Sequence, residues 1–194
     1  MDELLLYLRL GFKHIIDLGG VDHILFVLAL TLRYVWSDWK KILVLLTSFT
    51  IGHSLTLALS TLDLIDFSVN WIEFLIPVTI LITAVSNFWV KDFEFKQRYS
   101  AHYGLALLFG LIHGLGFSNY LKSLLGKETS LLGPLCSFNV GLEMGQILIV
   151  IVILTLSYCI LTLLKIPRKM YVRYGSILAI SLSLRMIMER IASL

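Results

Sequence analysis

The chain has 194 residues, of which 58% are hydrophobic and only 15% are charged, and its mean hydropathy is +0.87. These values lie outside the range of ordinary soluble domains and indicate a protein whose surroundings are lipid. The net charge of +3 is small and dispersed along the chain, which argues against a nucleic-acid-binding surface.

Residues 1–18 are predicted to form an amphipathic helix that lies at the membrane surface. Leucine, isoleucine and phenylalanine recur there at helical spacing among charged residues such as Arg9 and Lys13. Two glycines at 19–20 then end the helix. Met1 is followed by two acidic residues and not by a basic segment, so no cleaved signal peptide is expected.

The rest of the chain is predicted to cross the membrane six times, within a single domain that covers residues 1–194. Each predicted span is an apolar run that is long enough, or nearly long enough, to cross a bilayer, and the fifth run is longer than one span requires. The predicted spans lie at about residues 21–36, 42–62, 70–90, 101–121, 131–164 and 171–191. The predicted fold class is therefore all-α, a polytopic membrane protein.

The connections on the two sides of the predicted helices differ in basic residues. The connections after the first, third and fifth spans hold ten Lys and Arg residues, whereas the other side holds six. Basic connections stay on the cytoplasmic side of a membrane. A multi-pass protein of the plasma (inner) membrane with both termini outside is therefore expected.

Four potential metal ligands stand where the first helix meets the first span: His14, Asp17, Asp22 and His23. His14 and Asp17 are three residues apart, so they share a helix face. Asp22 and His23 follow the glycine break, where the chain can turn back toward the same point. Imidazole and carboxylate ligands suit Zn, Ni or Co, whereas a sulfur-preferring ion would favour cysteine.

Three further polar residues, His53, His113 and Glu143, fall inside predicted spans. The predicted topology puts all three at a similar depth, roughly 12–18 Å below the outer surface. A single membrane histidine often only bridges two helices, but the shared depth favours one metal site. Its predicted ligands are His14, Asp17, Asp22, His23, His53, His113 and Glu143. The fifth histidine, His102, is expected at the inner interface.

Two other features leave alternatives open. Arg185, near the outer end of the last span, could anchor the helix at the interface or reach into the cavity. A pattern of Phe-x-x-x-His at 49–53 and again at 109–113 suggests a parallel repeat. The two segments match at three positions, the Phe, the His and the Leu two residues after the His, which are too few to establish it.

The segments 14–26, 49–56, 111–117 and 138–146 together resemble the HupE/UreJ family of small membrane proteins. Some members of that family are regarded as nickel or cobalt permeases that accompany hydrogenase and urease systems. The resemblance implies that His14, Asp22, His23 and His113 are metal ligands. Seven residues separate His14 from the Asp22-His23 pair, where the nickel permeases have five, so the chain resembles a divergent branch.

The leading hypothesis is membrane transport of a divalent transition-metal ion, with the metal ion and the lipid bilayer as partners and no nucleic acid. The alternative is an intramembrane metal-dependent hydrolase. In that enzyme Asp17, Asp22 or Glu143 would act as general base, and Arg185 would hold a substrate phosphate or carboxylate. A metal-stabilised structural subunit is a third possibility. The inner halves of the spans offer few polar residues, which speaks against a transport path.

Overall fold

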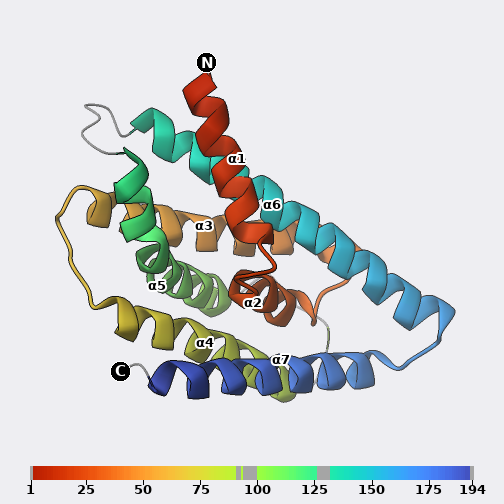
Figure 1. Ribbon diagram of the computed structural model, residues 1–194. Helices are drawn as coiled ribbons and strands as arrows, with labels where there is room; N and C mark the ends of the chain where they lie inside the picture. The colour runs from red at the N-terminus through yellow and green to blue at the C-terminus, as the bar shows by residue number, and fades with distance from the viewer. Residues whose placement is uncertain (1, 91–92, 94–99, 126–131, 193–194) are drawn as a thin grey trace.

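The computed structural model describes residues 2–90, 93, 100–125 and 132–192 (Figure 1). The described residues form helices and connections and include no strand. The seven α-helices are α1 (Asp2–Ile16), α2 (Asp22–Thr31), α3 (Trp39–Thr61), α4 (Val69–Ser86), α5 (Ser100–Leu125), α6 (Leu132–Tyr158) and α7 (Arg168–Ile191). Short turns extend three of them: the 3₁₀ turns η1 (Trp36–Asp38) and η2 (Asn87–Trp89), and a π turn, η3 (Cys159–Leu163).

Helices α3 and α5 run in the same direction and touch backbone to backbone. A Cβ atom added to Gly52 of α3 would overlap the Leu107 carbonyl of α5, and one added to Gly110 of α5 would overlap the Phe49 carbonyl of α3. Only glycine allows such an approach between membrane helices. The predicted Phe-x-x-x-His similarity falls on these two parallel helices.

Helices α1 and α6 form a second parallel pair of the same kind (Figure 1). A Cβ atom on Gly11 would overlap the Phe138 carbonyl, and one on Gly141 would overlap the Leu8 carbonyl. The α1 helix, expected at the membrane surface, therefore packs lengthwise on α6. Its position relative to a membrane stays a prediction.

The short helix α2 lies in the middle of the bundle, between these pairs and the antiparallel helices α4 and α7 (Figure 1). Seven of its ten residues are buried. By contrast, α6 presents large apolar side chains such as Val140, Leu148 and Ile151 on its exposed face. A contiguous apolar surface of this kind is expected to face lipid.

The structure confirms a helical membrane protein but gives a smaller number of clear spans. Four helical segments are long and apolar enough to cross a bilayer: Trp36–Thr61, Val69–Trp89, His102–Leu124 and Leu132–Leu163. The predicted span at 21–36 coincides with α2, which ends after ten residues. The predicted span at 171–191 coincides with α7, a full-length helix that is too polar to be counted. The number six therefore stays a prediction.

Candidate metal centre

Three histidines from three helices converge at the centre of the protein. His14 lies in the last turn of α1, His23 in the first turn of α2 and His53 near the middle of α3. One ring nitrogen from each can be chosen so that all three lie within 4.8 Å of one another. The ring centroids of His14 and His23 are 4.6 Å apart, and that of His53 lies 5.9 Å from the first and 6.2 Å from the second.

The turn between α1 and α2 brings the first two of these histidines together. Asp17 caps the end of α1: its carboxylate accepts a hydrogen bond of 2.9 Å from the Gly19 amide, and its carbonyl accepts one of 3.3 Å from the Gly20 amide. An aspartate that bonds the backbone two residues later is typical of a tight turn. The chain reverses here, so that α2 begins beside the end of α1.

The imidazoles of this cluster have unused hydrogen-bonding atoms. Nε2 of His14, Nε2 of His23 and both ring nitrogens of His53 are buried, and none has a hydrogen-bond partner among the described residues. Leaving a buried polar atom without a partner costs about 1–3 kcal/mol. Three adjacent imidazoles that each have such an atom are expected only where another species satisfies them. A metal ion, which accepts the lone pair of each imidazole, would do so.

The protonation state of His14 suits this role. Burial lowers the pKa of His14 well below its ordinary value of 6.5, and the neighbouring imidazoles of His23, His53 and His113 lower it further. The His14 side chain is therefore neutral at pH 7. A neutral imidazole is the form that binds a metal ion.

His113 of α5 stands next to the cluster, with its ring centroid 5.2 Å from that of His23. The Thr79 hydroxyl of α4 donates its one hydrogen to the Ile76 carbonyl at 2.7 Å, so it accepts the 3.0 Å hydrogen bond from Nε2 of His113. Nδ1 of His113 then carries the free lone pair, and it is buried without a partner. His113 is therefore held in the tautomer that carries its hydrogen on Nε2, beside the nitrogens of His14, His23 and His53.

A cavity of about 140 Å³ leads to the cluster from one side. Its lining combines three histidines with three carboxylates and one guanidinium: His14, His23, His113, Asp17, Asp22, Glu73 and Arg190. A larger open hollow of about 850 Å³ meets it at His14 and Asp17. The polar lining of the smaller cavity therefore includes His14 and His23, two members of the histidine cluster.

The other predicted site residues lie outside the cluster of His14, His23 and His53. Glu143 of α6 accepts a hydrogen bond of 2.8 Å from the Thr47 hydroxyl of α3, away from the cavity lining. Arg185 is 73% exposed and forms an ion pair of 2.8 Å with Glu189 on its own helix. Asp17 and Asp22 line the cavity but do not belong to the closest group of ligand atoms.

Sequence reasoning did not assign Glu73 and Arg190 to the cavity. They form an ion pair across the antiparallel helices α4 and α7, and both line the cavity beside Asp22. Glu73 stands near the start of α4 and Arg190 near the end of α7, which is why each resembles an ordinary interfacial residue in the sequence. The pairing depends on how α4 and α7 are aligned, and no local pattern reveals that alignment.

Comparison with known proteins identifies the family. No curated protein and no solved structure matches the chain. The model of the family described as "HupE / UreJ protein" matches residues 1–190, which is essentially the whole chain and covers α1 to α6 and all of α7 except its last residue. The protein belongs to the HupE/UreJ family.

Proposed function

We propose that this protein carries a divalent transition-metal ion of the nickel and cobalt class across the membrane, and that His14, His23 and His53 bind the ion on its way. Membership of the HupE/UreJ family, which is associated with nickel and cobalt transport, supports the class of ion. The single observation that supports the site is the convergence of unpartnered imidazole nitrogens from three separate helices.

The distances within the cluster are compatible with one shared ion. Two nitrogens bound to one ion at about 2.1 Å lie about 3.0–3.4 Å apart when the site is octahedral or tetrahedral. The nitrogens of His14, His23 and His53 lie within 4.8 Å of one another, so closure by up to about 2 Å would form the site. Side-chain rotation supplies a movement of this size. Imidazoles without a carboxylate in the closest group would bind the ion loosely enough to release it.

The carboxylates of the cavity would act before the histidines. Asp17, Asp22 and Glu73 line the route from the open side to His23. Carboxylates attract hydrated cations and replace some of their water ligands. We therefore assign these three residues to entry, and the imidazoles to the central binding step.

Polar residues also continue along α3 on the far side of His53. Thr50 donates a hydrogen bond of 3.1 Å to Gln146 of α6, and Thr47 donates one of 2.8 Å to Glu143. The sequence alone suggested few polar groups in this half of the span. We propose that Glu143, which does not reach the histidine cluster, receives the ion after His53.

One observation favours the alternative, a metal-dependent hydrolase. Arg190 lies in the same cavity as the cluster and the carboxylates, where it could hold an anionic substrate group. In such an enzyme Asp17 or Asp22 would act as general base on a metal-bound water. This role for a guanidinium was expected of Arg185, which is exposed instead.

Uptake of nickel into sealed proteoliposomes tests the proposal. The informative variant is His53→Gln, and the matched control is His102→Gln, because His102 bonds Arg33 outside the cluster. Transport predicts uptake by the wild type and the control and at least tenfold slower uptake by His53→Gln. The opposite result would be a wild-type protein that retains about one metal ion through dialysis but shows no uptake, and a His53→Gln variant that retains no ion. That result would refute transport and support the hydrolase.

A further inference from the structure

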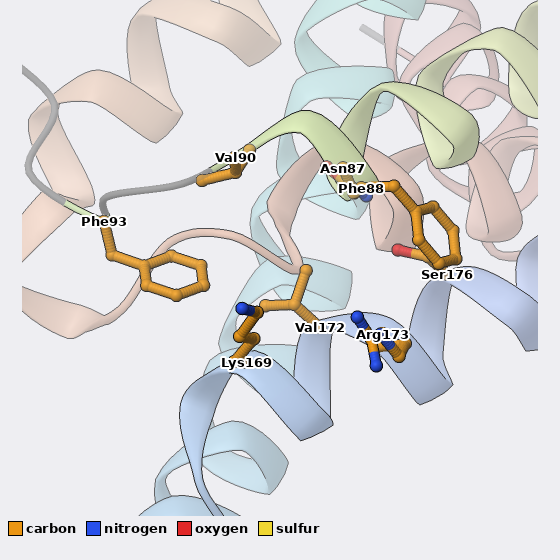
Figure 2. A pocket seen from close by; sticks show the side chains of 8 residues that line it. All are labelled: Asn87, Phe88, Val90, Phe93, Lys169, Val172, Arg173 and Ser176. Carbon is orange, nitrogen blue, oxygen red and sulfur yellow. The ribbon is translucent and has the colours of Figure 1, made fainter.

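A second polar pocket lies between the start of α7 and the end of α4, far along α7 from the metal cavity (Figure 2). Its volume is about 30 Å³, enough for one or two water molecules. The polar side chains that line it are Lys169, Arg173, Ser176 and Asn87, and two aromatic residues, Phe88 and Phe93, lie beside them. No part of this pocket belongs to the proposed metal path.

Among the described residues, the charged side chains that line this pocket are all basic. Lys169, Arg173 and Ser176 occur at i, i+4 and i+7 on α7, so they share one face of that helix, and Figure 2 shows all three on the α7 ribbon beside the end of α4. Of the described residues, no carboxylate lines the pocket, and none lies within 4.0 Å of the charged nitrogens of Lys169 or Arg173. The two exposed cations therefore face the pocket without a neutralising acid from the described part of the chain.

A buried hydroxyl at this pocket has no bonding partner. Ser176 is 0% exposed, and its Oγ makes no hydrogen bond to any described residue. Ser183 of the same helix instead donates to the Ile180 carbonyl, at 3.0 Å, as serines in helices usually do. The Ser176 hydroxyl can donate to an acceptor that enters the pocket.

The wall opposite α7 adds further positive charge. Both polar atoms of the Asn87 side chain are engaged: Nδ2 donates to the Ala29 carbonyl at 2.9 Å, and Oδ1 accepts from Nε of Arg33, also at 2.9 Å. The buried Arg33 guanidinium therefore stands directly behind this wall. The aromatic residues supply an apolar border, and the Phe93 ring lies 4.4 Å from the Arg168 guanidinium.

We propose that this pocket binds a phosphate group, and specifically the phosphodiester of an anionic phospholipid. The Ser176 hydroxyl would donate to a phosphate oxygen inside the pocket, and Lys169 and Arg173 would flank the remaining oxygens at the surface. The aromatic border suits the glycerol and the first acyl carbons. The basic connections put this end of the helices on the predicted inner side, where anionic lipids concentrate.

Thermal unfolding of the delipidated protein in a non-ionic detergent tests this assignment. Phosphatidylglycerol, diacylglycerol and inorganic phosphate are titrated separately into the wild type, into the Lys169→Gln/Arg173→Gln double variant and into Ser176→Ala. Arg185→Gln is the control, because it removes an exposed cation from the far end of the same helix. Each titration gives the midpoint concentration at which the melting temperature rises.

Phosphatidylglycerol is expected to stabilise the wild type and Arg185→Gln at the same midpoint concentration. The double variant should need about thirtyfold more phosphatidylglycerol, because it lacks two surface cations that each contribute about 1 kcal/mol to lipid binding. Ser176→Ala should be as stable as the wild type without lipid and need about fivefold more lipid. Equal midpoints in all variants, an equal effect of diacylglycerol, or no effect of phosphatidylglycerol would overturn the proposal. An equal effect of inorganic phosphate would overturn the lipid assignment in favour of free phosphate.

Discussion

Substitution of Gly110 by alanine tests the close contact between α3 and α5. The three atoms nearest to a Cβ at this position, the carbonyl oxygen and carbon of Phe49 and the amide nitrogen of His53, all belong to the α3 backbone. A backbone cannot move aside as a flexible side chain does, so the helices must separate. Overpacking of this kind costs about 1–3 kcal/mol, and the rigid neighbours favour the upper half of that range.

Gly104 on the same helix provides the control, because a Cβ there would meet no atom within 4 Å. Alanine is the better helix former by about 1 kcal/mol, so Gly104→Ala should be neutral or slightly stabilising. For a chain of this length, 1 kcal/mol corresponds to a shift of about 2–4 °C in melting temperature. The same gain in helix propensity offsets part of the cost at position 110, which leaves a net loss of about 1–2 kcal/mol. We therefore expect Gly110→Ala to melt about 2–8 °C below the wild type and Gly104→Ala at or just above it.

Tryptophan fluorescence during heating of the purified protein measures both variants side by side. Because Gly110 precedes His113 by one turn and touches the backbone beside His53, the same substitution should also lower nickel uptake. Melting of Gly110→Ala at or above the wild-type temperature would show that α3 and α5 do not approach as closely as described.

Three further predictions concern the histidines and a buried arginine. We predict that His113 joins His14, His23 and His53 as a fourth ligand through its free Nδ1, so Thr79→Val should weaken metal binding about 10–100-fold, the usual effect of removing a residue that orients a metal-binding imidazole. Thr83→Val, one turn away, removes a hydroxyl that donates to the Thr79 carbonyl and should leave metal binding unchanged. Equal titration curves for the two variants would show that His113 is not a ligand. Burial lowers the pKa of His14 below 6.5, so protonation of His14 competes with metal binding only at more acidic pH. Metal affinity, measured by competition with a coloured chelator, should therefore be constant from pH 8 to about 6.5 and fall below that. A loss of affinity centred near pH 6.5 or above would contradict the lowered pKa of His14. Asn87→Ala should lower the free energy of unfolding by about 2–3 kcal/mol, since it removes an acceptor from the buried guanidinium of Arg33, and a change in melting temperature below about 2 °C would show that water replaces the amide.

The helical membrane class and the family could be predicted from the sequence because both depend on long-range properties of the chain: apolar runs and widely spaced histidine motifs. The grouping of His14 with His23 could also be anticipated, because the glycine break lets the chain turn back toward the same point, and the depth of His53 follows from helix rise. Metal binding by these residues remains a prediction. The depth of Glu143 is different: it is expected level with His53, but its carboxylate bonds Thr47, which lies six residues, or about 9 Å, along α3 from His53. Helix rise within one span does not determine how α6 is aligned along α3.

Other parts of the structure could not be derived in this way. The span expected at 21–36 is interrupted because the chain turns after Thr31 and buries Arg33 against Asn87, His102 and Ser86. A hydropathy pattern records only that the segment is apolar. Similarly, Glu73 and Arg190 meet because α4 and α7 are antiparallel, and a charged residue near a helix end gives no sign of its partner 117 positions away.

The glycine contacts have a mechanical consequence for the histidines. Three of the four imidazoles lie on or beside the helical turns whose backbones touch a neighbouring helix. His14 follows Gly11 by one turn, His113 follows Gly110 by one turn, and His53 is adjacent to Gly52. The backbone contacts at these turns hinder movement of each helix along or around its neighbour. The exception is His23, on the ten-residue helix α2, which contains no glycine. Binding of an ion by the proposed centre would therefore depend on rotation of the other three imidazoles about their side-chain bonds and not on displacement of the helices that carry them.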